Sequence, residues 1–211
     1  MKRQLIIFGK APLSGQVKSR LAKQVGADAA AGVHARLLFA TAGCLSRLTH
    51  SGITVELSVA TAQGRAYFSE AFPELSVTEQ SEGDLGERMR TAFERAFDAG
   101  ADEVALVGSD IPDMSQDVVM RAFNALERVD LVLAPANDGG YVLIGMRDRT
   151  RAVFDGIEWG RSSVLKKTIA QVDRLGISCE LLEPLGDVDT VSDLRAWQSA
   201  VRDGKWLDLA Q

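Results

Sequence analysis

The 211-residue sequence predicts an α/β protein in which a mixed, mostly parallel β-sheet lies between two layers of helices. The first observation is a short apolar run, QLIIFG at residues 4–9, which ends in glycine and opens into a loop. The second is the regular alternation of such runs with helical patterns along the chain. The third is a pair of closely spaced strands around Asp138-Gly139-Gly140, which predicts one antiparallel pair.

The expected elements follow one another without repeats, low complexity or a linker, so residues 1–211 are expected to form one domain. Strands are expected at residues 4–9, 54–61, 75–78, 103–107, 130–134, 141–144 and 178–182. Helices are expected at residues 28–48, 64–72, 86–99, 162–175 and 191–201, with one more between 107 and 130. Ligands of such sheets bind beyond the carboxyl ends of the strands.

Composition narrows the class of protein. Apolar residues make up 46% of the chain, enough for one sizeable core, and the net charge of −5 argues against a general nucleic-acid-binding surface. No apolar run approaches the ~20 residues of a membrane span, so a cytoplasmic protein without membrane insertion is expected. His34 and His50 fall in one expected helix and match no triad or zinc motif, so histidine chemistry is not expected. The oligomeric state stays open.

A cationic loop follows the first expected strand. Lys10, Lys18 and Arg20 belong to a run of basic residues that precedes the first acidic residue, Asp28. Two glycines, one of them Gly15, allow the backbone to approach an anion, and the cations can converge on a polyphosphate if the loop curls back. The loop matches neither a P-loop nor a GxGxxG motif. It is a candidate phosphate loop, with an ordinary basic loop as the alternative.

A second loop, QSEGDLG at residues 80–86, lies between an expected strand and an expected helix. The amide of Gln80 can pair with the edge of a nucleobase, and Gly86 would let the base lie against backbone. Helix capping by Asp84 is the alternative interpretation of the same loop.

Carboxylates follow two further strands. Asp110 comes directly after a very apolar strand, where burial is costly unless a cation or hydrogen bonds compensate it; a turn before Pro112 is the alternative. Asp187 and Asp189 face the same way in extended chain, with Thr190 as a helix cap, although a double N-cap would look alike. Together, Asp110 and Asp189 supply the oxygen ligands that Mg²⁺ or Mn²⁺ prefers.

Six segments in this order, between about residues 4 and 197, resemble one bacterial family. They are FGKAPLSGQVKSRL, QSEGDLGERM, VGSDIP, APANDGGYVLIG, IEWGRSSVLKKT and DVDTVSDL. The family is known as glycosyltransferase-like, or as transferases associated with radical-SAM and selenocysteine-containing domains. It is similar to the nucleotide-diphospho-sugar transferases of GT-A fold, a superfamily that includes the molybdenum cofactor and 2-phospholactate guanylyltransferases.

The resemblance implies a role for each candidate residue. Those implied for nucleotide binding are Lys10, Gly15, Lys18, Arg20, Gln80 and Gly86. Those implied for acceptor binding are Asp138, Gly139, Gly140, Ser162 and Ser163. Asp110 and Asp189 would bind the metal, and Lys18 and Asp110 would act in catalysis. The family's usual Trp-Ser-Thr segment is replaced by Trp159-Gly160-Arg161, which leaves the acceptor open.

The resemblance implies metal-dependent transfer of a nucleotidyl group from a nucleoside triphosphate to a small phosphorylated acceptor. Glycosyl transfer from a nucleotide sugar would use the same base pocket and metal. A nucleotide-binding module without catalysis is the third interpretation, and it leaves the carboxylates at Asp110 and Asp189 unexplained.

Two expectations about single substitutions follow from this interpretation. Lys18→Ala should weaken triphosphate binding and leave folding nearly unchanged. Asp110→Asn could stabilise the protein without its metal, because two carboxylates that face one another across an absent cation repel.

Overall fold

A computed structural model describes residues 1–147 and 151–202, and in these residues seven strands form one sheet in the order β3-β2-β1-β4-β6-β5-β7. The strands are β1 (Arg3–Gly9), β2 (Thr54–Val59), β3 (Ser76–Glu79), β4 (Glu103–Gly108), β5 (Leu131–Pro135), β6 (Tyr141–Met146) and β7 (Cys179–Leu181). The first four strands pair in parallel, and β6 is antiparallel to both β4 and β5. The expected mixed sheet and the antiparallel pair are confirmed.

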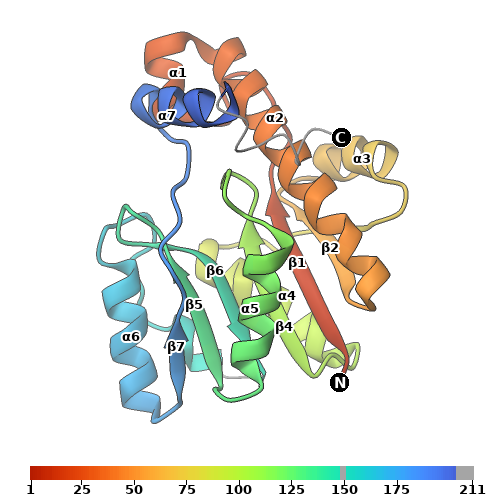
Figure 1. Cartoon of the computed structure of the whole chain (residues 1–211), viewed down its shortest axis with the longest axis vertical. Coiled ribbons are helices and arrows are strands. Elements are labelled where there is room, and N and C mark those ends of the chain that lie inside the picture. The colour runs from red at the N-terminus through yellow and green to blue at the C-terminus, as the bar shows by residue number, and fades with distance from the viewer. Residues whose placement is uncertain (148–150, 203–211) are drawn as a thin grey trace.

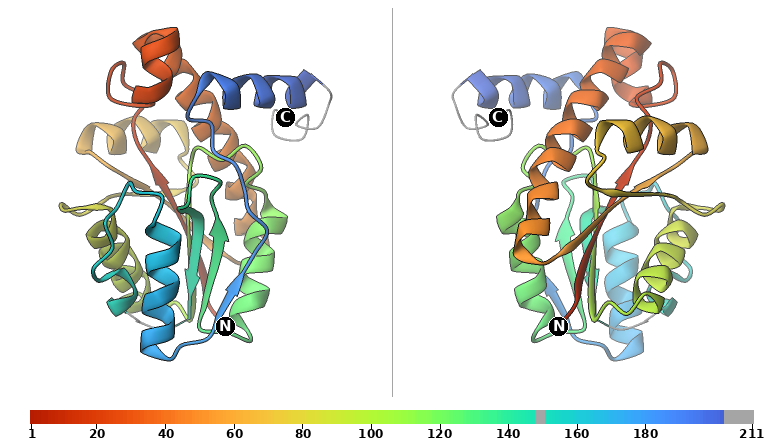
Figure 2. Two further views of the ribbon diagram at one scale, coloured as in Figure 1. Left: turned by 90° about the vertical axis from the view of Figure 1, so that its left-hand side faces the viewer. Right: turned by 90° about the vertical axis from the view of Figure 1, so that its right-hand side faces the viewer.

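The helices cover both faces of the sheet (Figure 2). They are α1 (Ser19–Val25), α2 (Ala27–Ser46), α3 (Ala62–Ala71), α4 (Leu85–Asp98), α5 (Gln116–Leu126), α6 (Val164–Leu175) and α7 (Val191–Arg202), with 3-10 turns η1 (Arg47–Ser51) and η2 (Arg151–Phe154). Helix α1 was not expected. It lies within the candidate phosphate loop, and its N-terminus has no side-chain cap that a sequence pattern could reveal.

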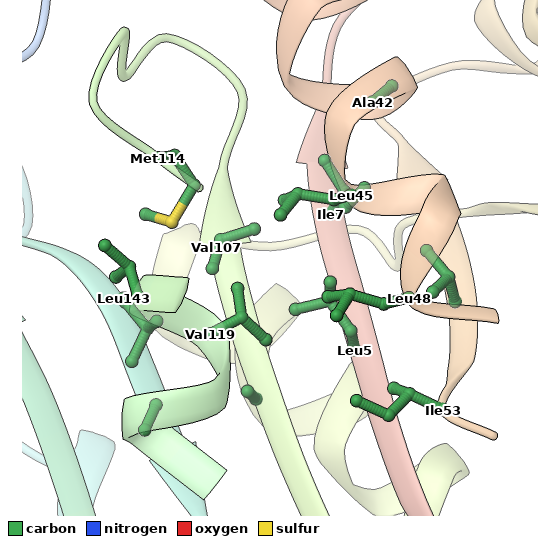
Figure 3. Packing of buried hydrophobic residues seen from close by; sticks show 14 of the residues in the cluster. Leu5, Ile7, Ala42, Leu45, Leu48, Ile53, Val107, Met114, Val119 and Leu143 are labelled. Atoms are coloured by element: carbon green, nitrogen blue, oxygen red, sulfur yellow. The ribbon is translucent and has the colours of Figure 1, made fainter. Parts of the chain in front are cut away.

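The two hydrophobic cores follow from the alternation of side chains along the strands. Leu5 and Ile7 of β1 point to one face, where helices α2, α3 and α5 supply the opposing residues. Figure 3 shows those of α2 and α5. Ile6 points to the other face, against α4 residues such as Phe93 and against Val172 of α6. A smaller apolar cluster joins α1, α2 and α7 above the carboxyl ends of the parallel strands (Figure 1).

The start of α4 confirms the alternative interpretation of the loop at residues 80–86, in which Asp84 caps a helix. Asp84 caps α4, because its side chain accepts a hydrogen bond from the Glu87 amide at 2.9 Å. Ser115 does the same for α5, through the Val118 amide. Such caps are each worth about 1 kcal/mol. The alternative interpretation of Asp84 as a helix cap is therefore confirmed.

One segment of the described residues, Ala27–Ser51, is long and apolar enough to cross a membrane by length and composition. No such run was expected from the sequence. Half of the qualifying window is buried inside the structure, and Leu38 and Leu45 belong to the core of the sheet. A core helix passes the same test, and the packing explains the apolar character of α2.

Candidate active site

A cavity of about 330 Å³ opens at the carboxyl ends of β1, β2 and β4, below α1 and α2. Figure 1 shows α1 at this edge of the sheet. Its lining comes from six segments of the chain: Phe8, Gly9, Lys10, Gln16, Val17, Lys18, His34, Ala60, Gln80, Leu85, Arg88, Gly108, Ser109 and Asp110. The structure thus brings Lys10, Lys18, Gln80 and Asp110 together around one space, although they lie up to 100 residues apart.

Lys18 lies at the centre of the charged residues. Its side chain is 1% exposed, and Nζ lies 2.8 Å from Asp110 Oδ2 and 3.1 Å from Asp189 Oδ1. The backbone of Lys18 has φ 50° and ψ 49°, a left-handed conformation that costs a non-glycine residue about 1–2 kcal/mol. That conformation starts α1 while the ammonium reaches both carboxylates. These contacts argue against the expectation that Lys18→Ala leaves folding nearly unchanged, because one buried ammonium is the ion-pair partner of two carboxylates.

Asp110 carries a carboxylate that its surroundings keep ionised. Burial would raise its pKa, but contacts with His34 and Lys18 outweigh that effect and lower the pKa from 3.8 to about 2. The same contacts argue against the expectation that Asp110→Asn could stabilise the protein without its metal, because the Asp110 carboxylate faces Lys18 and His34.

His34 was not among the site residues expected from the sequence. It is 3% exposed, and its Nε2 lies 2.9 Å from the Lys10 carbonyl oxygen, which only accepts, so Nε2 carries a proton. Its Nδ1 lies 3.0 Å from Asp110 Oδ1, without the alignment of a hydrogen bond. A signal was available: His34 shares a helical face with Leu37 and Leu38, and a buried imidazole needs polar partners.

A second, smaller hollow of about 210 Å³ has Asp189 in its lining, and Asp189 contacts Lys18 of the first cavity. It is lined by Arg20, Asn137, Asp138, Asp187, Asp189, Thr190 and Asp193. Burial, together with the charges of Asp189 and Asp138, raises the pKa of Asp187. Arg20 is 67% exposed and lies 3.8 Å from Asp189, too exposed to neutralise the group. This hollow is therefore electronegative.

The hydrogen bonds at the start of α7 distinguish the two interpretations of Asp187 and Asp189, as metal ligands or as a double N-cap. Thr190 Oγ1 accepts from the Asp193 amide at 3.3 Å, and Asp193 Oδ2 accepts from the Thr190 amide at 2.7 Å. This reciprocal pair caps the helix, as expected for Thr190. The side chain of Asp189 takes no part in the cap and turns to Lys18 instead. A double N-cap does not account for Asp189.

The carboxylates of this site have the oxygen atoms that a divalent cation prefers as ligands. Asp110 Oδ1 is buried without a hydrogen-bond donor, and Asp187 and Asp189 add carboxylate oxygens nearby. In the described ranges no three such side chains already surround one metal-sized position. Lys18 Nζ instead bridges Asp110 and Asp189, so these carboxylates are held close together by a cation of the protein itself.

The amide of Gln80 is engaged by the protein. Its Nε2 donates to the Ser58 carbonyl at 2.8 Å and approaches the Gly9 carbonyl at 3.4 Å. Its Oε1 accepts from Arg88 at 3.1 Å. Gln80 and Arg88 both line the cavity, and Arg88 was not among the residues that the sequence singled out.

Two glycines from the expected nucleotide set are not part of the cavity lining, although their chain neighbours Gln16 and Leu85 are. A Cβ on Gly86 would lie 2.5 Å from Trp159 Nε1, so this glycine allows the indole to pack on the first turn of α4. Gly15 has φ 75° with open space around it, so glycine is favoured there by the backbone conformation of the turn.

The segments expected to bind the acceptor approach one another closely. Gly139 has φ 91°, and a Cβ there would collide with the Ser162 backbone. Asp138 Oδ1 accepts from the Gly140 amide at 3.0 Å, which shapes the turn. Only Asp138 of this set lines the second hollow; Ser163 precedes α6 without capping it through its side chain.

We expect Gly139→Ala to lower the free energy of unfolding by at least about 2 kcal/mol, because it combines an unfavourable φ with a backbone collision. Gly160→Ala is the matched control: it has φ 76° but nothing within 4 Å, so only the cost of φ, about 1–2 kcal/mol, applies. Urea denaturation of both variants measures the difference. Equal losses would show that the approach to Ser162 is unimportant.

Comparisons with known proteins agree with this geometry. A family model described as "uncharacterized protein conserved in bacteria (DUF2064)" matches residues 44–161. A 2-phospho-L-lactate guanylyltransferase from Methanopyrus kandleri is 31% identical over 112 residues, which are 47% of this chain; the match spans about half of that relative, 56% of its length.

Solved structures share the fold. A crystal structure from Desulfovibrio desulfuricans G20, described as a candidate nucleotide-diphospho-sugar transferase, is 37% identical, with a TM-score of 0.85 over 92% of this chain and 85% of that one. Rv0371C from Mycobacterium tuberculosis H37Rv, solved in complex with manganese, is 15% identical, with a TM-score of 0.57 over 95% and 100% of the two chains. At that identity the likeness shows the fold alone. The expected nucleotide-diphospho-sugar transferase fold is confirmed.

Proposed function

We propose, from the premise that the chain belongs to the bacterial family DUF2064, that it transfers a nucleotidyl group from a nucleoside triphosphate to a small phosphorylated acceptor. The reaction depends on Mg²⁺ or Mn²⁺. The observation that carries the proposal is the buried Lys18 ammonium, which contacts Asp110 of the larger cavity and Asp189 of the smaller one.

The proposed roles divide between the two cavities. The larger one takes the nucleotide, with Lys10 and Lys18 donating to its phosphates. Lys18 has three N–H donors, and the two carboxylates use two of them, which leaves one for a phosphate oxygen. The smaller one, beside Asp138, takes the acceptor once the divalent cation offsets its carboxylates, and Arg20 at its rim binds a phosphate of the nucleotide.

In the proposed reaction an acceptor phosphate oxygen attacks the α-phosphorus, and pyrophosphate leaves, so no side-chain nucleophile is needed. Asp110 and Asp189 would hold the divalent cation, which supplies charge neutralisation on the phosphates. Lys18 stabilises the negative charge that develops on the phosphates in the transition state. His34 contacts both the Lys10 carbonyl and Asp110, and so holds these two groups in place. The cavity walls hold the two reactants in line.

Glycosyl transfer is the second candidate, favoured by the 37% identical relative described as a candidate nucleotide-diphospho-sugar transferase. The two reactions release different products. We expect pyrophosphate from a nucleoside triphosphate, whereas glycosyl transfer releases a nucleoside diphosphate from a nucleotide sugar.

The test begins with thermal shifts for nucleoside triphosphates and nucleotide sugars, with and without Mg²⁺ or Mn²⁺, since ligands that bind the native state raise its melting temperature. Panels of phosphorylated acceptors are then assayed for released pyrophosphate. Metal-dependent stabilisation by nucleotide sugars alone, with diphosphate release, would replace the nucleotidyl reaction by the glycosyl one. No stabilisation by either class would refute both.

Two wider expectations belong to the same proposal. The participation of all seven strands in one sheet supports a single domain over residues 1–211. An association with radical-SAM and selenocysteine-containing domains, which the motifs imply, stays a prediction.

A further inference from the structure

We propose that Arg88 reads the base of the bound nucleotide, that Gln80 is its positioning residue, and that the base is guanine. The inference rests on the proposed function, because it assigns the base-binding end of the same cavity.

The larger cavity has two chemically different ends. The charged residues Lys10, Lys18 and Asp110 lie at the end formed by β1 and β4. The other end, over β2 and β3, is formed by small and apolar residues, and by the paired side chains of Gln80 and Arg88. Leu85 is 36% exposed there and offers an apolar surface to the face of a base.

The separation of the two ends suits a nucleotide. Gln80 follows β3 and Asp110 follows β4, and these strands are three positions apart in the sheet. At about 4.8 Å per strand, the backbone ends of β3 and β4 are about 14 Å apart. The Gln80 amide reaches back to within 3.4 Å of the Gly9 carbonyl at the end of β1, so the side chains at the two ends of the cavity lie closer together than that. A nucleoside triphosphate has its base at one end and its phosphates at the other, and it can span this length.

Gln80 cannot read the base with its own donors. Both hydrogens of its amide face backbone carbonyls, of Ser58 at 2.8 Å and Gly9 at 3.4 Å. Carbonyl oxygens can only accept hydrogen bonds, so the side-chain atom that faces them must be the NH₂ group and the opposite atom must be Oε1. That oxygen holds Arg88 at 3.1 Å, and the amide therefore orients the guanidinium.

Arg88 keeps donors free toward the cavity. Its Nε approaches the Asp84 carbonyl within α4 at 3.4 Å, and one terminal nitrogen donates to Gln80. Within residues 1–147 and 151–202 it forms no ion pair with a carboxylate, unlike Arg90 on the same helix, which pairs with Asp155 at 2.7 Å. A cation oriented by a neutral amide is available to acceptor atoms of a ligand.

The chemistry of the base edges then selects among bases. The guanidinium offers two parallel donors, and guanine presents two adjacent acceptors, O6 and N7. Adenine presents N7 beside an amino donor, which would face an Arg donor. A good bidentate contact of this kind discriminates by about 1–3 kcal/mol, or roughly 5- to 150-fold.

The experiment measures the affinity of the full chain for GTP, 7-deaza-GTP, ATP and CTP in the presence of Mg²⁺, by calorimetry. We expect wild type to bind GTP roughly 5- to 150-fold more tightly than ATP or 7-deaza-GTP, which lacks the N7 acceptor. Arg88→Ala and Arg88→Lys should bring that preference below about 3-fold and leave the ATP affinity unchanged. Gln80→Met should lower the same ratio by a smaller factor.

Arg90→Ala is the matched control, since it removes a cation from the same helix outside the cavity; it should keep the preference. Equal weakening of GTP and ATP by Arg88→Ala, an unchanged preference in that variant, or a wild-type preference for CTP or ATP would each overturn the inference. A Gln80→Met protein that melts lower but keeps the ratio would overturn the positioning role. Nucleotides that bind without base preference refute this inference alone, whereas no binding of any nucleotide refutes the proposed function as well.

Discussion

Lys18→Met should lower the free energy of unfolding by about 2–4 kcal/mol at neutral pH. Methionine keeps most of the side-chain volume but leaves Asp110 and Asp189 without the ammonium that lies 2.8 and 3.1 Å from them. Removing one partner of a buried ion pair typically costs about 3–5 kcal/mol. The carboxylates are 35% and 36% exposed, so water screens them and the loss falls toward the lower end.

Urea denaturation at pH 7 measures this loss, with Lys10→Met as the control. Lys10 also lines the cavity, but its exposed Nζ donates only to the Gln16 carbonyl among the contacts seen in the described chain. Adding Mg²⁺ should raise the melting temperature of Lys18→Met more than that of wild type, because Asp110 and Asp189 bind the cation more strongly when no ammonium competes for their oxygens. Equal stability of the two variants would contradict the central place of Lys18.

The same substitution should weaken nucleoside triphosphate binding by about 1.5–3 kcal/mol, the worth of one charged hydrogen bond, and change nucleoside binding much less. Calorimetry with the triphosphate and the nucleoside separates the two effects, provided that both are measured where the variant is folded. Equal losses for both ligands would remove Lys18 from the phosphate site and leave its role in folding.

Much of this architecture could be predicted because the local signals agree with the global fold. The apolar runs at β1 and β4 mark the buried centre of the sheet, and the polar residues that follow them had to emerge at one edge. Asp110 was found in that way. Thr190 was found from its position before a helical pattern, and its cap is present.

The pairing of side chains could not be predicted in the same way. Which cation meets Asp110 depends on the path of residues 10–18, and that path requires a left-handed lysine at Lys18, a conformation without a sequence signal. His34 reaches the site only because α2 crosses the edge of the sheet. Arg88 lies one helical turn after the cap of α4, where the sequence looks like an ordinary polar helix face.

The contacts of Asp110 lead us to expect the opposite sign for one substitution, and Asp110→Asn tests it. The pKa of Asp110 lies at about 2 against an ordinary value of 3.8, so the folded protein favours the charged form. Its contribution to stability is complete above about pH 4 and is lost as the pH falls toward 2. With screening of a partly exposed group, Asp110→Asn should cost about 1–2 kcal/mol at neutral pH. Metal-dependent transfer should fall by at least roughly 100-fold.

Asp187→Asn provides a control of opposite sign. The pKa of Asp187 is raised by burial and by the charges of Asp189 and Asp138, so its ionised form destabilises the fold. That penalty is complete above the folded pKa and disappears as the pH falls below the ordinary value. We therefore expect Asp187→Asn to raise stability at pH 7 where Asp110→Asn lowers it, with both differences from wild type shrinking in acid. If Asp110→Asn instead raised stability at pH 7, Lys18 and His34 would not be compensating the Asp110 carboxylate, and repulsion between Asp110 and Asp189 would control this site.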